Sequence, residues 1–310
     1  MKKVAVIVPT IREDCIKKFL REWEKEFTAV FVIEDNPKRT FKIKQAEVCH
    51  YSWKEINETL GGNSWIIPRR TDCIRSFGFY KAYWADADII ITLDDDCYPL
   101  DRNFLQTHLM MLQRQAGKWI GTTTKIKPRG FPFRNLGDGG SIVLNMGFWR
   151  GVADLDAPTQ LVYGPQDLEP YVGIIPRGAY FPLCGMNIAF KREIMPMMYW
   201  LLMGKDYEYD RFGDIWCGIF AKKICDHLGL GIHVGTPAVE HERASNVWRN
   251  LGKEYRALEV NETLWEIVDN VKLTKKTVKD CYIELAQKLP MKGNYWNKLK
   301  RAMQVWASLF

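Results

Sequence analysis

Residues 4–35, VAVIVPTIREDCIKKFLREWEKEFTAVFVIED, contain two apolar, β-branched runs separated by an amphipathic segment. The runs at 4–8 and 29–33 are continuous, which is typical of strands buried on both faces of a parallel sheet. Between them, apolar side chains recur at the i, i+3, i+4, i+7 spacing of a helix: Ile16, Phe19, Leu20, Trp23 and Phe27. A strand, a helix and a strand in this order form a βαβ unit, so the sequence predicts an α/β protein with a doubly wound sheet.

Further elements follow along the chain. Strands are expected at 89–93, 119–124, 142–144, 187–190 and 231–234. Helices are expected at 71–84, 102–115, 214–228 and 278–289. Residues 125–141 are rich in Gly, Pro and Arg and predict a long loop, and loops of that length are often functional. We expect one main domain over residues 1–270 and a C-terminal helical extension over 271–310.

The net charge of +7 is carried by the C-terminal segment. Residues 271–310 contain nine basic and two acidic side chains, which leaves residues 1–270 formally neutral. A basic protein is a candidate nucleic-acid binder, but a balanced main domain argues against that class of partner. We expect no nucleic acid.

The same segment carries an apolar stripe beside Lys298, Lys300 and Arg301. Its members recur at helical spacing: Tyr295, Trp296, Leu299, Ala302, Met303, Trp306, Leu309 and Phe310. We expect this helix to pack on its own domain or on a second copy in a homo-oligomer. Peripheral contact with an anionic membrane is the alternative.

The eight cysteines are scattered, without a C-x-x-C pair. This argues against a zinc ribbon and against a disulfide framework. The apolar run before Pro9 is five residues long, shorter than a signal peptide needs. No apolar run approaches the roughly 20 residues of a membrane span. We therefore expect a soluble, cytoplasmic protein with reduced thiols.

Three carboxylates, Asp94, Asp95 and Asp96, directly follow the predicted strand at 89–93. Adjacent like charges raise one another's pKa unless a cation neutralises them. Ligands of open α/β sheets bind at the carboxyl ends of the strands. The triplet therefore predicts a site for a hard divalent cation, Mn²⁺ or Mg²⁺. The alternative is a solvated acidic turn in which Asp96 caps the next helix.

Polar residues also follow the first two predicted strands and should emerge at the same edge. Pro9, Thr10 and Arg12 follow the first strand, and Asp35 follows the second. A carboxylate can accept the imide N–H of uracil, and an arginine can bind phosphate. The alternative is that these are ordinary cap and turn residues. Neither loop is glycine-rich, which argues against NAD enzymes and P-loop ATPases.

Seven segments lie in order along the chain: VPTIR (8–12), LDDDC (93–97), RGFPF (129–133), DAPTQL (156–161), FPLCGMN (181–187), CDHL (225–228) and CYIEL (281–285). Together they resemble the reversibly glycosylated polypeptide family, whose plant members include UDP-arabinopyranose mutases. The resemblance implies one nucleotide-binding α/β domain of the glycosyltransferase A type, with a divalent ion held by a D-x-D motif. It implies that Asp94, Asp95 and Asp96 bind metal and UDP-sugar, that Asp35 binds uracil, and that His241 is a further metal ligand.

The resemblance also implies that Arg129 becomes covalently glycosylated when the protein meets a UDP-sugar. A guanidinium is protonated in water and is a poor nucleophile, so it needs a carboxylate base, for which Asp214 is the candidate. Phosphate binding is the alternative role of Arg129. Arg75 matches the family pattern and either holds the diphosphate or forms a structural salt bridge.

Two positions differ from the family pattern. Gly213 stands where the family usually has an acidic residue, and Leu136 stands where plant members carry a second arginine. The second difference bears on mutase activity more than on UDP-sugar binding, and the first leaves Asp214 as the one acidic residue of the pair.

The sequence thus predicts a metal-dependent glycosyltransferase that uses a UDP-sugar of the UDP-glucose or UDP-arabinose type. It would glycosylate itself on Arg129, and the sugar would either stay on the protein as a primer or return to UDP with a changed ring form. The alternatives are a UDP-sugar mutase proper, a transferase acting on a separate acceptor, and a non-catalytic UDP-sugar-binding scaffold.

Overall fold

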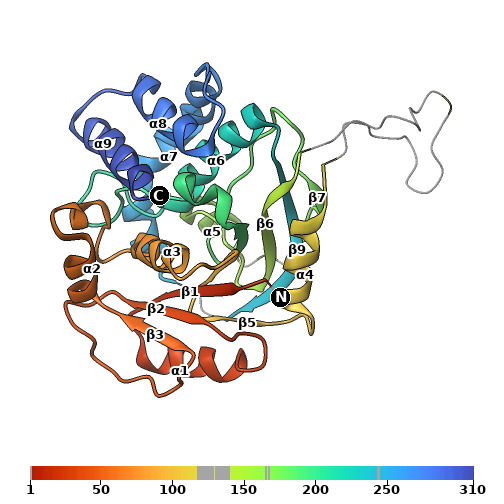
Figure 1. The fold of residues 1–310 in the computed structure, drawn as a ribbon, viewed down its shortest axis with the longest axis vertical. Helices are drawn as coiled ribbons and strands as arrows, with labels where there is room; N and C mark the ends of the chain where they lie inside the picture. The colour runs from red at the N-terminus through yellow and green to blue at the C-terminus, as the bar shows by residue number, and fades with distance from the viewer. Residues whose placement is uncertain (1, 117–128, 130–139, 165, 167, 243–244) are drawn as a thin grey trace.

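A mixed β-sheet runs through the middle of the protein (Figure 1). The computed structural model describes residues 2–116, 129, 140–164, 166, 168–242 and 245–310. The strands within this part of the chain are β1 (Val4–Thr10), β2 (Val30–Glu34), β3 (Val48–Tyr51), β4 (Ile89–Leu93), β5 (Cys97–Pro99), β6 (Ile142–Gly151), β7 (Gly173–Ile174), β8 (Asn187–Lys191) and β9 (Gly231–His241). They pair in the order β3-β2-β1-β4-β8-β6-β9-β5, and β7 pairs with β9.

The strand directions bring many chain segments to one edge of the sheet. β3, β2, β1 and β4 are parallel. β8 is antiparallel to both β4 and β6, and β9 is parallel to β6. The carboxyl ends of β1, β2, β4, β6 and β9 therefore share an edge with the beginnings of β8 and β5. We call this the carboxyl edge.

Helices cover both faces of the sheet (Figure 1). They are α1 (Glu13–Glu22), α2 (Trp53–Leu60), α3 (Arg75–Trp84), α4 (Phe104–Gln113), α5 (Ala157–Tyr163), α6 (Gly213–Leu228), α7 (Val247–Asp269), α8 (Val278–Lys288) and α9 (Asn294–Ser308), with 3₁₀ turns at Gly61–Ile66, Asp72–Ile74 and Arg192–Met197. In β1, Val6 and Val8 face the core with α1 and α4, and Ala5 and Ile7 face the core with α3 and α6 to α9. Burial on both faces explains why the strand is apolar at successive positions.

The predicted α/β class is confirmed, and so are most of the predicted elements. The βαβ unit is β1, α1 and β2, and the strands expected at 142–144, 187–190 and 231–234 are the longer β6, β8 and β9. The strand expected at 119–124 lies outside the described residues, as does most of the loop expected at 125–141. The sequence reasoning missed β3, α2 and the long α7.

The C-terminal segment is helical, as expected, but it is an integral part of the main core. The apolar stripe of α9 lies in the same buried cluster as α3 and α6. The Trp306 ring stacks on Tyr199 at 5.3 Å, and its Nε1 donates to the carbonyl of Met195 at 3.4 Å. Residues 271–310 therefore continue the core of residues 1–270 rather than extend from it, and the stripe faces protein. None of the described helices combines the length and apolar composition that crossing a bilayer requires.

Candidate functional site at the carboxyl edge of the sheet

The acidic triplet forms a tight turn between β4 and β5. The Cys97 N–H donates to the carbonyl of Asp94 at 3.1 Å, which closes the turn. Asp95 and Asp96 are buried. The helix that follows begins at Phe104 and is preceded by Asn103, so the alternative that Asp96 caps it is wrong.

Arg12 neutralises two of the three carboxylates. Its guanidinium forms an ion pair with Asp95, and its Nη2 donates to Asp96 Oδ2 at 2.8 Å. Thr10 Oγ1 donates to Asp95 Oδ2 at 2.5 Å. Pro9, Thr10 and Arg12 are thus placed beside the triplet, as expected from the end of β1, and Thr10 and Arg12 contact Asp95 directly.

Arg75 neutralises the third carboxylate from within the core. Its Nη2 donates to Asp94 Oδ1, and its Nη1 donates to Thr92 Oγ1 at 2.8 Å and to the Gly185 carbonyl at 2.9 Å. Its Nε donates to the carbonyl of Asp72 at 3.2 Å. Because the side chain is 1% exposed and its nitrogens are engaged in this way, the geometry favours the structural salt bridge over the diphosphate role.

His241 lies beside Asp96 at the end of β9. Its Nδ1 donates to the carbonyl oxygen of Val152 at 2.7 Å, so Nε2 is the ring nitrogen that faces Asp96. That Nε2 is 3.7 Å from Asp96 Oδ1. A ring nitrogen held by a carbonyl on its far side is the arrangement of a metal-ligating histidine, so this pair fits a divalent cation. Among the described residues, no three acidic, histidine or cysteine side chains are already gathered as a metal site, and Asp94 is turned toward Arg75.

Asp35 fixes the loop at the end of β2. Its Oδ1 accepts from Trp53 Nε1 at 2.7 Å, and its Oδ2 accepts from the Thr71 N–H at 2.8 Å. Burial raises the pKa of Asp35, and the hydrogen bonds from Arg70, Trp53 and Thr71 offset only part of that rise. The carboxylate is thus held rigidly at the carboxyl edge with the Trp53 indole bonded to it.

Asp214 enters the site from the first turn of α6. Its Oδ2 accepts from the Gly185 N–H at 2.8 Å, just before β8. Burial, together with the nearby charges of Asp72 and Asp154, raises the pKa of Asp214 to about 8. The carboxyl group is therefore mostly protonated at neutral pH.

The glycine before Asp214 is explained by close packing. A Cβ at Gly213 would lie 2.3 Å from Cys73 Sγ and 2.9 Å from the Trp200 carbonyl oxygen. A larger side chain does not fit at this position unless Cys73 and the backbone at Trp200 move.

Asp154 is a site residue that the sequence reasoning missed. It follows β6, and the thiol of Cys184 hydrogen-bonds with it. Its side chain is exposed to solvent, and the charge of Asp94 acts on it electrostatically. The prediction ended this strand at residue 144, whereas β6 continues to Gly151. A strand of the observed length would have placed Asp154 at the carboxyl edge.

Arg129 is exposed. Residues 117–128 and 130–139, which include Leu136, lie outside the described part of the chain. The predicted glycosyl acceptor therefore remains a prediction from the sequence.

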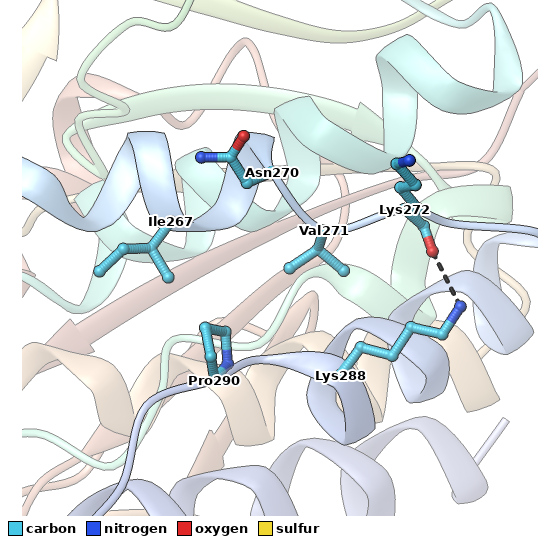
Figure 2. A pocket seen from close by; sticks show the side chains of 6 residues that line it. All are labelled: Ile267, Asn270, Val271, Lys272, Lys288 and Pro290. Carbon is cyan, nitrogen blue, oxygen red and sulfur yellow. Dashed lines mark hydrogen bonds between the residues drawn. The ribbon is translucent and has the colours of Figure 1, made fainter.

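A separate surface pocket lies between the end of α7 and α8 (Figure 2). It has a volume of about 310 Å³ and is lined by Ile267, Asn270, Val271, Lys272, Lys288 and Pro290. The ammonium of Lys288 donates across it to the Lys272 carbonyl at 2.8 Å. The lining contains no carboxylate and shares no residue with the carboxyl edge, so the chemistry indicated by the acidic residues lies elsewhere.

Sequence comparisons with known proteins extend over nearly the whole chain. A family model described as "Reversibly glycosylated polypeptide" matches residues 1–310. UDP-arabinopyranose mutase 1 of Arabidopsis thaliana is 34% identical over 97% of this chain and 90% of its own. Probable UDP-arabinopyranose mutase 1 of Zea mays is 33% identical over 97% of this chain and 88% of its own. A solved structure of 4-diphosphocytidyl-2C-methyl-D-erythritol synthase from Anaerococcus prevotii aligns with a TM-score of 0.40 and 9% identity, over 83% of this chain and 96% of that chain.

Proposed function

Because the chain belongs to the reversibly glycosylated polypeptide family, we propose that it is an enzyme that binds a UDP-sugar at the carboxyl edge of its sheet and transfers the glycosyl unit. One observation carries the proposal. The ends of β1, β2, β4, β6 and β9 bring an acidic triplet, two arginines and His241 to one edge. This is the place where α/β sheets bind nucleotides.

Asp35 and Arg12 are the proposed contacts for the nucleotide. Asp35 is held by Trp53 and Thr71, with a further hydrogen bond from Arg70, and its two oxygens together keep one lone pair for the uracil imide. Arg12 carries one terminal nitrogen, Nη1, for which the described contacts include no hydrogen bond. That nitrogen is suited to a phosphate oxygen.

The proposed divalent cation is Mn²⁺, with Mg²⁺ as the alternative. Asp96 and His241 would hold it, and Asp94 would join them on turning away from Arg75. When bound, the cation supplies positive charge that stabilises the diphosphate as it leaves.

Arg129 and Asp214 are the proposed groups for transfer. The bond between the anomeric carbon and the β-phosphate oxygen breaks, UDP leaves, and a carbon–nitrogen bond to Arg129 forms. The guanidinium proton passes to ionised Asp214, whose raised pKa makes it a stronger base than an ordinary aspartate. The reverse transfer returns the sugar to UDP. The alternative, favoured by the names of the plant relatives, is a mutase that releases UDP-sugar with a changed ring form.

Intact-protein mass spectrometry after exposure to UDP-glucose or UDP-arabinopyranose, with Mn²⁺ or with EDTA, tests the proposal. We expect the added mass of one sugar on the wild type, with Mn²⁺ only, and none on Arg129→Ala. Arg177→Ala is a matched control, since Arg177 is an exposed loop arginine. Full labelling of Arg129→Ala would contradict the acceptor assignment. Unlabelled protein that interconverts the ring forms would support the mutase alternative, and failure to bind UDP or either sugar nucleotide would contradict both.

A further inference from the structure

Arg211 has an unusual backbone conformation directly before α6. Its φ is +65°, in the left-handed region that residues with a side chain rarely adopt. Such conformations persist where the surroundings impose them, and they concentrate at functional sites. The strain orients the Arg211 side chain from the loop that also delivers Asp214.

Glu254 of α7 holds that side chain in place. Its Oε1 accepts from Arg211 Nε at 2.7 Å, and its Oε2 accepts from the Ala157 N–H at the start of α5 at 2.7 Å. Glu254 is buried, and both of its carboxylate oxygens are used. It therefore fixes Arg211 relative to the loop that follows β6, in which Asp154 lies.

Arg211 differs from the other arginines of the site in the nitrogens that it leaves available. Arg75 is buried and uses both terminal nitrogens, and Arg12 uses one of them on the acidic triplet. Within the described part of the chain, Arg211 has a hydrogen bond from Nε alone. Its side chain is 33% exposed. Two donors of fixed orientation are therefore open to a ligand.

The surroundings of Arg211 favour a neutral ligand over a phosphate. Asp154 and Asp72 act on its guanidinium electrostatically, and their charges would repel a diphosphate. A guanidinium beside a carboxylate supplies a donor and an acceptor together, which suits adjacent sugar hydroxyls. Asp154 also acts electrostatically on Asp214, and Asp94 acts on Asp154, which relates this pair to the acidic residues of the carboxyl edge.

We propose that Arg211, positioned by Glu254, binds the glycosyl unit of the UDP-sugar through its two terminal nitrogens, opposite Asp154. This inference rests on the proposed function and adds the sugar subsite to it. Arg211 and Asp154 then distinguish a UDP-sugar from UDP, whereas Asp35 and Arg12 bind both.

Isothermal titration with UDP and with the UDP-sugar that the wild type binds tests this directly. We expect Arg211→Gln and Asp154→Asn to weaken UDP-sugar binding about tenfold, the effect of losing a hydrogen-bonding pair, and to leave UDP binding within about twofold. Arg249→Gln, which removes an exposed arginine of α7, should change neither. An equal loss for both ligands, or no loss for either, would overturn the subsite while leaving the proposed function standing. A wild type that binds neither ligand would overturn both.

The positioning role of Glu254 is tested by a measurement that a purely structural role would not affect, namely the difference between UDP-sugar binding and UDP binding. We expect Glu254→Gln to weaken UDP-sugar binding and not UDP binding, and to add nothing when combined with Arg211→Gln. Additive losses in the double variant would overturn positioning through Arg211. Thermal melting checks that the variants fold. If Glu254→Gln does not fold, Arg211→Lys takes its place, because lysine keeps the positive charge and loses the planar fork that Glu254 orients. Arg211→Lys should then weaken UDP-sugar binding and not UDP binding.

Discussion

Replacing Arg75 with methionine should destabilise the protein strongly and in a pH-dependent way. Methionine fills much of the buried space but removes the cation that faces Asp94 and the donors to Thr92 and Gly185. If Arg75 instead served mainly to grip the diphosphate, the change would weaken nucleotide binding and leave stability nearly intact.

The size of the effect follows from the exposure of the two partners. Removing one partner of a buried ion pair costs about 3–5 kcal/mol. Arg75 is 1% exposed, but Asp94 is 30% exposed, so water screens part of the loss and the lower end, about 3 kcal/mol, applies. The three other oxygens that lose their donors, Thr92 Oγ1 and the carbonyls of Gly185 and Asp72, add about 1 kcal/mol together. At roughly 2 °C per kcal/mol for a chain of this size, the melting temperature should fall by about 8 °C.

The pH dependence identifies Asp94 as the cause. Burial raises the pKa of Asp94, but Arg75 and other cations outweigh it and the net shift is downward. This carboxylate therefore stabilises the wild type above its unfolded pKa of about 4, and the contribution is lost as pH falls. In Arg75→Met the charge is unpaired at neutral pH and is relieved by protonation. The difference in unfolding free energy between the two proteins should therefore narrow as the pH falls through the raised pKa of Asp94 in the variant towards its lowered pKa in the wild type, because the unfolded chains titrate alike.

Urea unfolding from pH 3.5 to 7.5 measures this difference, with Arg249→Met as the control at an exposed site. An unchanged melting temperature together with weaker UDP binding would refute the structural role. A stability loss that is the same at every pH would show that packing, rather than the Asp94 charge, is responsible.

Three further predictions concern other buried groups. Burial lowers the pKa of His108 to about 3 and that of His233 to about 4. Because the unfolded chain takes up these two protons near pH 6.5, the free energy of unfolding should fall as the pH drops from about 6.5 to about 4. Urea unfolding measures it, and a free energy that stays constant over this range would contradict the burial of two neutral histidines. Gly213→Ala should lower the free energy of unfolding by about 1–3 kcal/mol, because the added Cβ clashes with Cys73. Adding Cys73→Ala to this variant should restore part of the lost stability. A Gly213→Ala variant that melts at the wild-type temperature would contradict the packing argument. If Asp214 is the base, turnover should rise with pH through about 8 and lose that dependence in Asp214→Asn, whereas a rate that falls over this range would assign it as an acid.

The sequence was sufficient to predict the parts of the fold that depend on local periodicity. Continuous apolar runs identified β1, β2 and β4, and their ends correctly placed Thr10, Asp35 and the triplet at one edge. α7 was missed because three large aromatic residues, Trp248, Tyr255 and Trp265, lie on its exposed face. Apolar residues therefore occur on both faces of this helix, and the sequence lacks the separate apolar and polar faces by which a surface helix is predicted.

The choice of partners could not be predicted in the same way. From the sequence, Arg75 could bind either a phosphate or a carboxylate of the protein. The fold decides between them, because it brings Asp94, Thr92 and Gly185 around the guanidinium. Asp154 lies 60 residues beyond Asp94 in the chain and has no local signal of its own. Pairing across such distances depends on sheet order, which apolar periodicity does not specify.

The buried thiols around the site have a consequence for chemical labelling. Cys73, Cys97 and Cys184 are all buried, beside Gly213, the acidic turn and Asp154 respectively. Burial, the leading cause in each case, raises the pKa of all three thiols far above the ordinary value, so they stay protonated and slow to react. Cys49, on the exposed surface of β3, is accessible. A thiol reagent should therefore modify Cys49 first, and later modification of Cys73, Cys97 or Cys184 in particular would record how often the carboxyl edge opens.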